Sequence, residues 1–271
     1  MHQASDDIYY TALILETETA ASVVHKLGQL ESELPGNIYF MVDNIMTCAS
    51  HQINVNIFWT GRNSVEVSRG VPIVQDLIVS LLANEPISPV NVTASTISWT
   101  SLSGPPAASI SSGWNDHVWA AQTWTGYLHA ENNTAEIWRD IMTTIVHGVD
   151  DALFLAPDVE FWGGAIHDKA WHETAFPYRD AIWNVGVLLM IPATLPNAQE
   201  VYQIQAAKVN AWWSSVSKYL TGSYVNYPMI SLRDDYPQAF WGDNLPRLVK
   251  MKQRVDPDNV YDFPMSVPVT L

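Results

Sequence analysis

Hydrophobic positions along the first third of the chain alternate between strand and helix spacing. Residues 8–15 (IYYTALIL) form a β-branched and aromatic run that predicts a strand. Residues 53–59 alternate asparagine with valine and isoleucine, as a half-buried strand does. Residues 19–34 have the spacing of an amphipathic helix, which Pro35 and Gly36 end. The pattern therefore places a helix between two early strands.

A further strand is expected at 38–42 and an apolar helix at 71–83. The resulting order is β-α-β-β-α, with connections too short for parallel crossovers. It predicts an antiparallel sheet with helices packed on one face, an α+β fold. We expect residues 84–116, rich in serine, proline and glycine, to form a long loop that acts as the lid or wall of a pocket.

The second half of the chain adds a helix at 133–148, strands at 159–166 and 181–191, and a long helix at 199–220. Repeats, low-complexity tracts and charged linkers are absent from the sequence. We therefore expect residues 8–271 to form a single domain of the substrate-binding type.

The stretch 240–264 has a distinct local pattern. Asp243 or Asn244 is placed to cap a helix whose first turn contains Pro246. The turn Asp256-Pro-Asp-Asn259 then ends that helix, and the chain continues as an extended tail. These residues predict a short amphipathic helix, a turn and a docking segment.

The same stretch resembles a known family. Phe240-Trp-Gly-Asp-Asn-Leu-Pro-Arg-Leu248, followed by Asp256-Pro-Asp-Asn-Val-Tyr-Asp-Phe-Pro264, is similar to the C-terminal signature of the berberine-bridge-enzyme-like flavin oxidases. Gly163-Gly-Ala-Ile-His-Asp168 with Thr174–Trp183, and Tyr224-Val-Asn-Tyr227, resemble two more of its motifs. The resemblance implies the substrate domain of the vanillyl-alcohol-oxidase/berberine-bridge type, with residues 240–268 as its C-terminal segment.

Composition limits the partners. The net charge of −15 and a pI near 4.7 argue against nucleic acid and against an anionic membrane surface. The single cysteine, Cys48, excludes an internal disulfide and a cysteine-based zinc site, and the histidines lack metal-ligand spacing. Sequons at Asn91 and Asn132 permit secretion, but residues 1–20 are too polar for a signal peptide, so any leader has been removed from this numbering. The sequence leaves the localisation open.

Several features depart from the family. The sequence has no GxGxxG and no triple-glycine loop. We therefore expect the flavin-binding domain to be absent and no FAD or other cofactor to bind. Gly186 stands where the resemblance implies a polar residue that orients the substrate, and Tyr178 replaces a histidine.

Candidate site residues follow from the resemblance and from an aromatic content of 11%. Tyr224, Tyr227 and Arg179 are the candidate catalytic groups, as hydrogen-bond donors or an anchor for a ligand oxygen. Aromatic walls bind unsaturated ligands, so the following are expected to contact substrate: Trp114, His117, Trp119, Trp124, Trp183, Asn226, Phe240 and Trp241. The alternative is that these aromatic side chains fill the core or cover a surface for another domain.

Three functional hypotheses remain open. The first is a flavin-independent enzyme of natural-product biosynthesis that binds a small, apolar, unsaturated or quinone-methide-like metabolite and promotes cyclisation, Diels–Alder-type cycloaddition or isomerisation. The second is the substrate-domain half of a split FAD-dependent oxidase. The third is a non-catalytic binding protein or dimeric scaffold, with a homodimer formed through the face that would otherwise meet a flavin domain.

Overall fold

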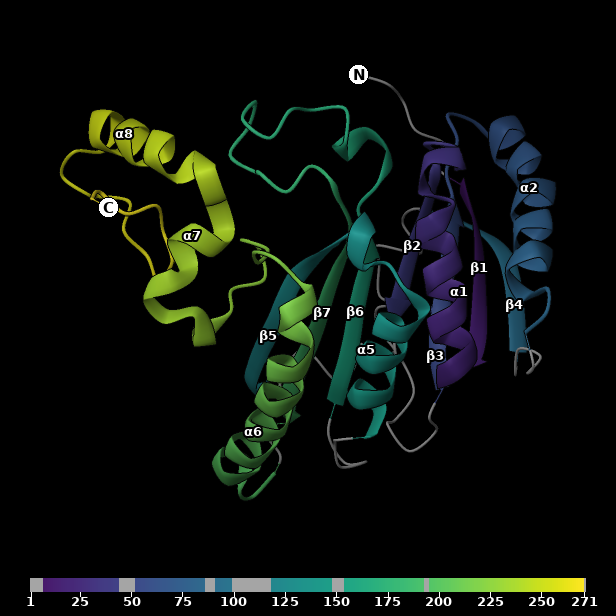
Figure 1. Ribbon diagram of the computed structural model, residues 1–271, viewed down its shortest axis with the longest axis horizontal. Helices are drawn as coiled ribbons and strands as arrows, with labels where there is room; N and C mark the ends of the chain where they lie inside the picture. Colours follow the sequence, from purple (N-terminus) through teal and green to yellow (C-terminus); the bar gives the residue numbers. More distant parts are fainter. Residues whose placement is uncertain are drawn as a thin grey trace.

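The computed structural model describes residues 7–43, 52–85, 91–98, 118–147, 154–192 and 195–270. Seven strands form one antiparallel sheet in the order β4-β1-β3-β2-β6-β7-β5 (Figure 1). The strands are β1 (Asp7–Glu16), β2 (Ile38–Asp43), β3 (Gln52–Trp59), β4 (Asn91–Ser98), β5 (Val118–His129), β6 (Phe154–Phe161) and β7 (Ala181–Pro192). The expected α+β class with an antiparallel sheet is confirmed.

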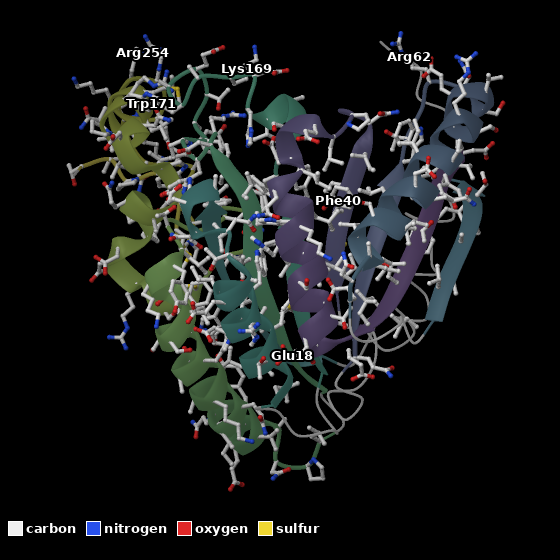
Figure 2. All side chains as sticks on the ribbon, turned by 45° about the vertical axis from the view of Figure 1, so that its right-hand side comes forward. Glu18, Phe40, Arg62, Lys169, Trp171 and Arg254 are labelled. Atoms are coloured by element: carbon white, nitrogen blue, oxygen red, sulfur yellow. The ribbon has the colours of Figure 1, made fainter. Side chains whose placement is uncertain are left out.

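Four helices pack on one face of this sheet, with α1, α5 and α6 lying side by side across it (Figure 1). They are α1 (Thr17–Gln29), α2 (Ser64–Leu82), α5 (Ala135–His147) and α6 (Ala198–Val216). Short 3-10 turns are η1 (Glu31–Glu33), η3 (Ala130–Asn132), η4 (Gly164–Ile166) and η5 (Ser217–Tyr219). The main core lies between these helices and the sheet; Phe40, labelled in the middle of Figure 2, is fully buried there.

Strand alternation explains which face the helices cover. Val159 and Phe161 of β6 are buried in the helix-covered core. Asp158 and Glu160 alternate with them and therefore point to the opposite face. Only one face of the sheet is apolar enough to bury under helices, so the polar face stays free of them.

Two buried contacts join the helices to the sheet and to one another. The Trp138 ring of α5 meets the Trp183 ring of β7 edge to face, with centroids 5.5 Å apart. The Asn133 side chain accepts a hydrogen bond from the Trp138 indole (2.7 Å) and donates one to the His25 carbonyl of α1 (3.1 Å). Asn133 thus ties α1 to α5.

The C-terminal residues form a smaller unit beside the sheet, drawn in yellow-green in Figure 1. It consists of η6 (Ile230–Asp235), α7 (Tyr236–Trp241), η7 (Gly242–Asn244) and α8 (Leu245–Val255). Its own core contains Phe240, Trp241, Leu245, Leu248 and Val249. The helix expected after Asn244 is present, but the Asn244 side chain does not cap it; its amide donates to the Trp171 carbonyl instead (2.7 Å).

Some expected boundaries are wrong. Strand β4 lies inside the segment expected to be a loop, and β5 falls where no strand was expected. Helix α2 begins at Ser64, seven residues before the expected start, because the Asn63 side chain accepts hydrogen bonds from the amides of Val65 and Glu66. Strand β6 ends at Phe161, and η4 follows it.

Candidate functional site on the helix-free face of the sheet

One row of directly opposed residues crosses the helix-free face of the sheet. Asn56, Met41, Glu160, Asn184 and Tyr127 come from β3, β2, β6, β7 and β5, each paired with the next. A carboxylate thus lies near the middle of the sheet, with an amide beside it and a phenol one strand further along. The loop after η5 adds Tyr224 and Tyr227 to this face through the contacts below.

Glu160 accepts hydrogen bonds from three side chains. Its Oε1 accepts from the Tyr227 hydroxyl at 3.2 Å, and its Oε2 accepts from the Asn184 amide at 3.0 Å and the Trp162 indole at 3.3 Å. Three donors hold the carboxylate in one orientation, and Oε1, which accepts one hydrogen bond, has a further acceptor site. Glu160 is therefore a fixed, negatively charged acceptor that is half-buried.

A second carboxylate, Asp158, lies two residues earlier on the same face of β6. Burial, followed by the charges of Glu160 and Asp158, raises the pKa of Tyr39 well above its usual value. Burial and the same two carboxylates, together with the hydrogen bond to Glu160, also raise the pKa of Tyr227 strongly. Both phenols therefore stay neutral at physiological pH, and that of Tyr227 donates to Glu160.

Aromatic rings close around this polar centre. The Tyr224 ring lies edge to face against Tyr227 (centroids 5.0 Å apart) and against Trp162 (4.8 Å). The Asn226 amide donates to the Tyr224 hydroxyl at 2.7 Å. Trp162 in turn packs on Tyr127 (5.1 Å) and Phe176 (5.1 Å). The result is a wall of packed rings beside a carboxylate.

Two buried polar atoms of this site have no hydrogen-bond partner within the described part of the chain. They are the Tyr127 hydroxyl and Asn184 Oδ1, whose residues are opposed on β5 and β7. One is a donor and the other an acceptor. Buried polar groups are normally paired, so these atoms suit a bound hydroxyl or a water molecule. Burial also raises the pKa of Tyr127, which keeps its hydroxyl proton available.

The structure brings three of the sequence-derived candidates together: Tyr224, Tyr227 and Asn226. Arg179 lies apart from them. Its guanidinium donates to the carbonyls of Phe176 (3.2 Å) and Ile166 (3.3 Å), and it lies 4.9 Å from the centre of the Phe176 ring. Arg179 therefore fixes the loop before β7, and its donors are used within that loop.

The candidate tryptophans have other places. Trp124 and Trp183 are fully buried on the helix side of the sheet, and the Trp124 indole donates to Asn210 of α6 at 2.9 Å. Phe240 and Trp241 belong to the C-terminal core. These four residues therefore lie in the two cores, Trp124 and Trp183 because of strand alternation and Phe240 and Trp241 because of the packing of α7. Trp119 is in β5, but its side chain, like Trp114 and His117, lies outside the described residues.

Sequence reasoning did not single out Glu160, Asp158, Asn184 or Trp162. Alternation of Asp158 and Glu160 with Val159 and Phe161 was the available signal, because two carboxylates on one face of a central strand are costly without a role. Asn184 carries a weaker signal as a polar residue within an apolar strand.

Gly186 lies on the same face as Asn184, opposite Asp158 and Thr125. A Cβ added there would lie 3.0 Å from the Asp158 carbonyl oxygen and 3.2 Å from the Thr125 methyl. The neighbouring strands therefore fill the space of a side chain at this position. Asn184 and Glu160 place polar groups on that face instead.

The described segments contain no group of three or more His, Cys, Asp or Glu side chains placed to hold a metal ion. No helix in them is long and apolar enough to cross a membrane. Of the two sequons, Asn91 is the first residue of edge strand β4. The Asn132 amide donates to the Tyr219 carbonyl at 2.9 Å and is half-buried.

The chain is similar to a family model and to several known proteins. Residues 223–268 match the family model described as "Berberine and berberine like". The chain is 31% identical over 140 residues to an uncharacterised FAD-linked oxidoreductase, YgaK, of Bacillus subtilis, covering 52% of this chain and 25% of that protein. It is 32% identical over 100 residues to a carbohydrate oxidase of Microdochium nivale, covering 35% and 19%.

Solved structures share the fold over nearly the whole chain. An aclacinomycin oxidoreductase aligns with a TM-score of 0.75 and 18% identity, covering 97% of this chain and 55% of its own. A chitooligosaccharide oxidase aligns with a TM-score of 0.73 and 19% identity, covering 97% and 56%. The chain spans about half the length of these structures, and the matches with the two curated relatives span a quarter of their length or less.

The sheet, its helix layer and the C-terminal segment are thus those of a berberine-bridge-enzyme-like substrate domain. The resemblance in residues 163–264 is thus confirmed: the C-terminal residues match the berberine-like family model, and the chain is similar to FAD-linked oxidoreductases over part of their length.

Proposed function

We propose that this chain is the substrate-binding part of an FAD-linked oxidase, and that Glu160 accepts a proton from a hydroxyl group of the substrate. The observation that carries the proposal is the carboxylate fixed by Tyr227, Asn184 and Trp162 on the helix-free face of the sheet. A general base has to be held within hydrogen-bond reach of the proton that it removes. Three donors fix Glu160 in that way.

The groups next to Glu160 orient the substrate. The unpartnered Tyr127 hydroxyl and Asn184 Oδ1 are closed to solvent and hold a buried water molecule, one as donor and one as acceptor. The edges and faces of Trp162 and Tyr224 cover the apolar side of the molecule and exclude water from the carboxylate. This arrangement suits a hydroxylated substrate with one apolar face.

The oxidation removes one proton and one hydride from the alcohol. The O–H bond of the alcohol breaks, its proton goes to Glu160, and the C–H bond breaks with its electron pair as the carbonyl forms. FAD, when bound, supplies the acceptor of that hydride. Since the sequence has no glycine-rich phosphate loop, this chain meets such a group only from the substrate side. The exposed side chains of Tyr261 (75%) and Phe263 (63%) offer apolar surface to the polypeptide that carries it.

The test compares Glu160→Gln with the parent in the flavin-loaded protein, whether the flavin-carrying part is on this polypeptide or on a second one. We expect kcat to fall roughly 100-fold or more, because the amide cannot accept the proton. KM should change little, since glutamine keeps the shape and most of the hydrogen bonds. A panel of neutral sugars and simple alcohols serves as substrates, in line with the carbohydrate oxidase relative.

Glu200→Gln on the exposed surface of α6 is the matched control. Unchanged kcat in Glu160→Gln would remove the carboxylate from the mechanism. A colourless protein whose visible spectrum ignores added FAD, and which binds no flavin-carrying partner, would contradict the oxidase proposal as a whole.

Cyclisation without a cofactor is the second candidate. The packed rings of Trp162, Tyr224 and Phe176 favour it, since an aromatic wall binds and folds an unsaturated substrate. In this case Tyr224 or Tyr227 donates a hydrogen bond to a substrate carbonyl. Conversion of a reactive polyene by the flavin-free chain, with loss of rate in Tyr224→Phe, would favour this candidate. This second proposal includes binding of a small apolar metabolite and formation of a homodimer.

A further inference from the structure

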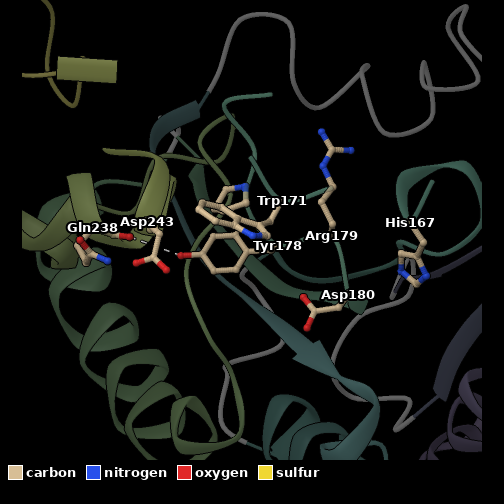
Figure 3. A pocket seen from close by; sticks show the side chains of 9 residues that line it. His167, Trp171, Tyr178, Arg179, Asp180, Gln238 and Asp243 are labelled. Carbon is tan, nitrogen blue, oxygen red and sulfur yellow. Dashed lines mark hydrogen bonds between the residues drawn. The ribbon is translucent and has the colours of Figure 1, made fainter. Parts of the chain in front are cut away.

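A cavity of about 660 Å³ lies outside the sheet-face site, between the loop that precedes β7 and the start of the C-terminal unit (Figure 3). Trp171, Tyr178 and Asp180 line it from the loop, and Gln238 and Asp243 line it from α7 and η7. Its volume falls in the range of small-molecule binding sites. None of these residues takes part in the contacts of Glu160.

Tyr178 forms a fixed aromatic wall of this cavity. One face of its ring stacks on the buried Tyr127 ring, with centroids 4.7 Å apart and planes at 27°. Its hydroxyl donates to the Ala239 carbonyl at 2.6 Å. Gly222 closes on the ring from another side, with φ of +59°, and a Cβ there would lie 2.1 Å from the phenol carbon. The wall is therefore formed before any ligand arrives.

Trp171 supplies a second aromatic surface. Its side chain is 48% exposed, which is unusual for a residue of this size, and it lies beside Tyr178 in the cavity (Figure 3). The loop that carries it is held in place, because the Asn244 amide donates to the Trp171 carbonyl at 2.7 Å. Figure 2 shows Trp171 at the same end of the molecule as Arg254 of α8.

Polar groups with unused hydrogen-bond capacity surround these rings. Within the described residues, the Gln238 amide and the Asp243 carboxylate make no side-chain hydrogen bond. The Asp180 carboxylate is 85% exposed and contacts only the ring of His129, at 3.4 Å. Carboxylates and amides accept and donate hydrogen bonds to hydroxyl groups at fixed angles.

The charged groups of the cavity largely offset one another. Asp180 and Asp243 repel an anion, and the Arg179 guanidinium, which also lines the cavity, offsets one of these two negative charges. We propose that this cavity binds a neutral sugar ring, whose apolar face lies on Trp171 or Tyr178 and whose hydroxyl groups bond to Gln238, Asp243 and Asp180. Such a ligand uses both kinds of surface.

This site is separate from the one on the sheet. The buried Tyr127 ring and the Tyr178 ring stacked on it lie between the two, so a sugar in the cavity does not touch Glu160. The inference stands on the cavity alone and does not depend on the proposed oxidation. An oxidase could use such a site to hold a second sugar unit or a glycan surface.

The experiment titrates the purified chain with cellobiose, maltose and chitobiose, and follows binding by calorimetry and tryptophan fluorescence. We expect at least one of them to bind with a Kd of about 1 mM or below. Trp171→Ala should weaken that binding about 10-fold or more, and Trp171→Phe should restore part of it. Binding that Glu160→Gln weakens as much as Trp171→Ala does would place the sugar at the sheet-face site and overturn the proposal.

Tyr261→Ala, which removes an exposed aromatic ring elsewhere, is the control and should bind like the parent. Equal binding by the parent and Trp171→Ala would overturn the proposal, as would the absence of binding by all three sugars. Tetramethylammonium serves as a second probe. Binding of that cation with loss in Trp171→Ala and in Asp243→Asn, while no sugar binds, would identify a cation site and contradict the proposal.

Discussion

Tyr227 donates a hydrogen bond to Glu160 across 3.2 Å, although the two residues are 67 positions apart in the chain. The bond joins the loop after η5 to the central strand β6. It gives the carboxylate a neutral donor that burial prevents from ionising. The loop and the sheet therefore form one site, whose geometry depends on both.

Tyr227→Phe should slow the oxidation of a bound alcohol. Removal of the phenol leaves the Glu160 carboxylate with two donors and frees it to rotate, so we expect kcat to fall about 10-fold. Steady-state kinetics of the flavin-loaded protein measures this. Tyr219→Phe removes a similar phenol–carboxylate bond, to Asp140 at 3.1 Å, away from the site and should leave kcat unchanged. Equal effects of both variants would show that Tyr227 has no special role.

The buried tyrosines predict how the fold responds to alkali. Burial and then Asp243 raise the pKa of Tyr178 to about 12, and the pKa values of Tyr127 and Tyr227 are raised further. An unfolded tyrosine ionises near pH 10, so stability is fully present below that pH and is lost as the pH rises through the folded pKa values.

We therefore expect alkaline unfolding above about pH 10, with tyrosinate absorbance and circular dichroism changing together. A large, reversible tyrosinate signal from Tyr127, Tyr178 and Tyr227 at pH 10, in a protein that is still folded, would contradict this prediction. The exposed Tyr261 should ionise early and serves as the internal reference.

The C-terminal segment should loosen in acid. The Asp256 carboxylate accepts from the Lys252 ammonium and from the amides of Val260 (2.7 Å) and Tyr261 (3.1 Å). These bonds, with that of Lys252 first, hold the pKa of Asp256 below its usual value. A depressed carboxylate pKa contributes stability above the unfolded value, near 3.8, and this stability is lost as the pH falls through the folded value.

Hydrogen exchange measures that change locally. Protection factors of the amides of residues 256–266 should fall below about pH 4, and Asp256→Asn should reproduce this at neutral pH. Asp258→Asn, at an exposed position of the same turn, is the control. If Asp256→Asn leaves protection unaltered, the carboxylate does not hold the turn.

Gly186→Ala should destabilise the sheet. A methyl group at this position meets the carbonyl oxygens of Asp158 and Trp124, at 3.0 and 3.3 Å, and the Thr125 methyl at 3.2 Å. Backbone atoms yield little, so we expect a loss of about 1–3 kcal/mol in the free energy of unfolding, measured in urea. Gly36→Ala, where nothing lies within 4 Å, should cost much less. Glutamine at 186 should therefore damage the strand pairing before it adds any polar function.

Periodicity sufficed for the central strands and for the helices, because each of them buries one continuous apolar face in the core. It failed for β4 and β5, which are the two edges of the sheet. In β4 (NVTASTIS) each face has one large apolar residue, Val92 or Ile97, among small or polar ones, and β5 contains Gly126, which strand statistics disfavour. Edge strands are stabilised by pairing with a neighbour, and a single sequence does not display that pairing.

The candidate site could be predicted only where its residues lie close together in the sequence. Tyr224, Asn226 and Tyr227 lie within four residues of one another, so their association needed no knowledge of the fold. Glu160 joins them through sheet register and a distant loop, which are tertiary facts. Trp124 and Trp183 were predicted to contact substrate but are fully buried. The sequence alone does not distinguish a tryptophan of the core from one that lines a pocket.

The alternation of Asp158 and Glu160 with Val159 and Phe161 affects how this protein can evolve. Because β6 is paired on both sides, inserting or deleting one residue would exchange the two faces and bury charge in the core. Changes in length are therefore forbidden here. Substitutions at the even-numbered positions leave the core intact, so a lineage can exchange one specificity for another there at little cost in stability. The core-facing residues of β6 can therefore stay constant while the residues on its other face change.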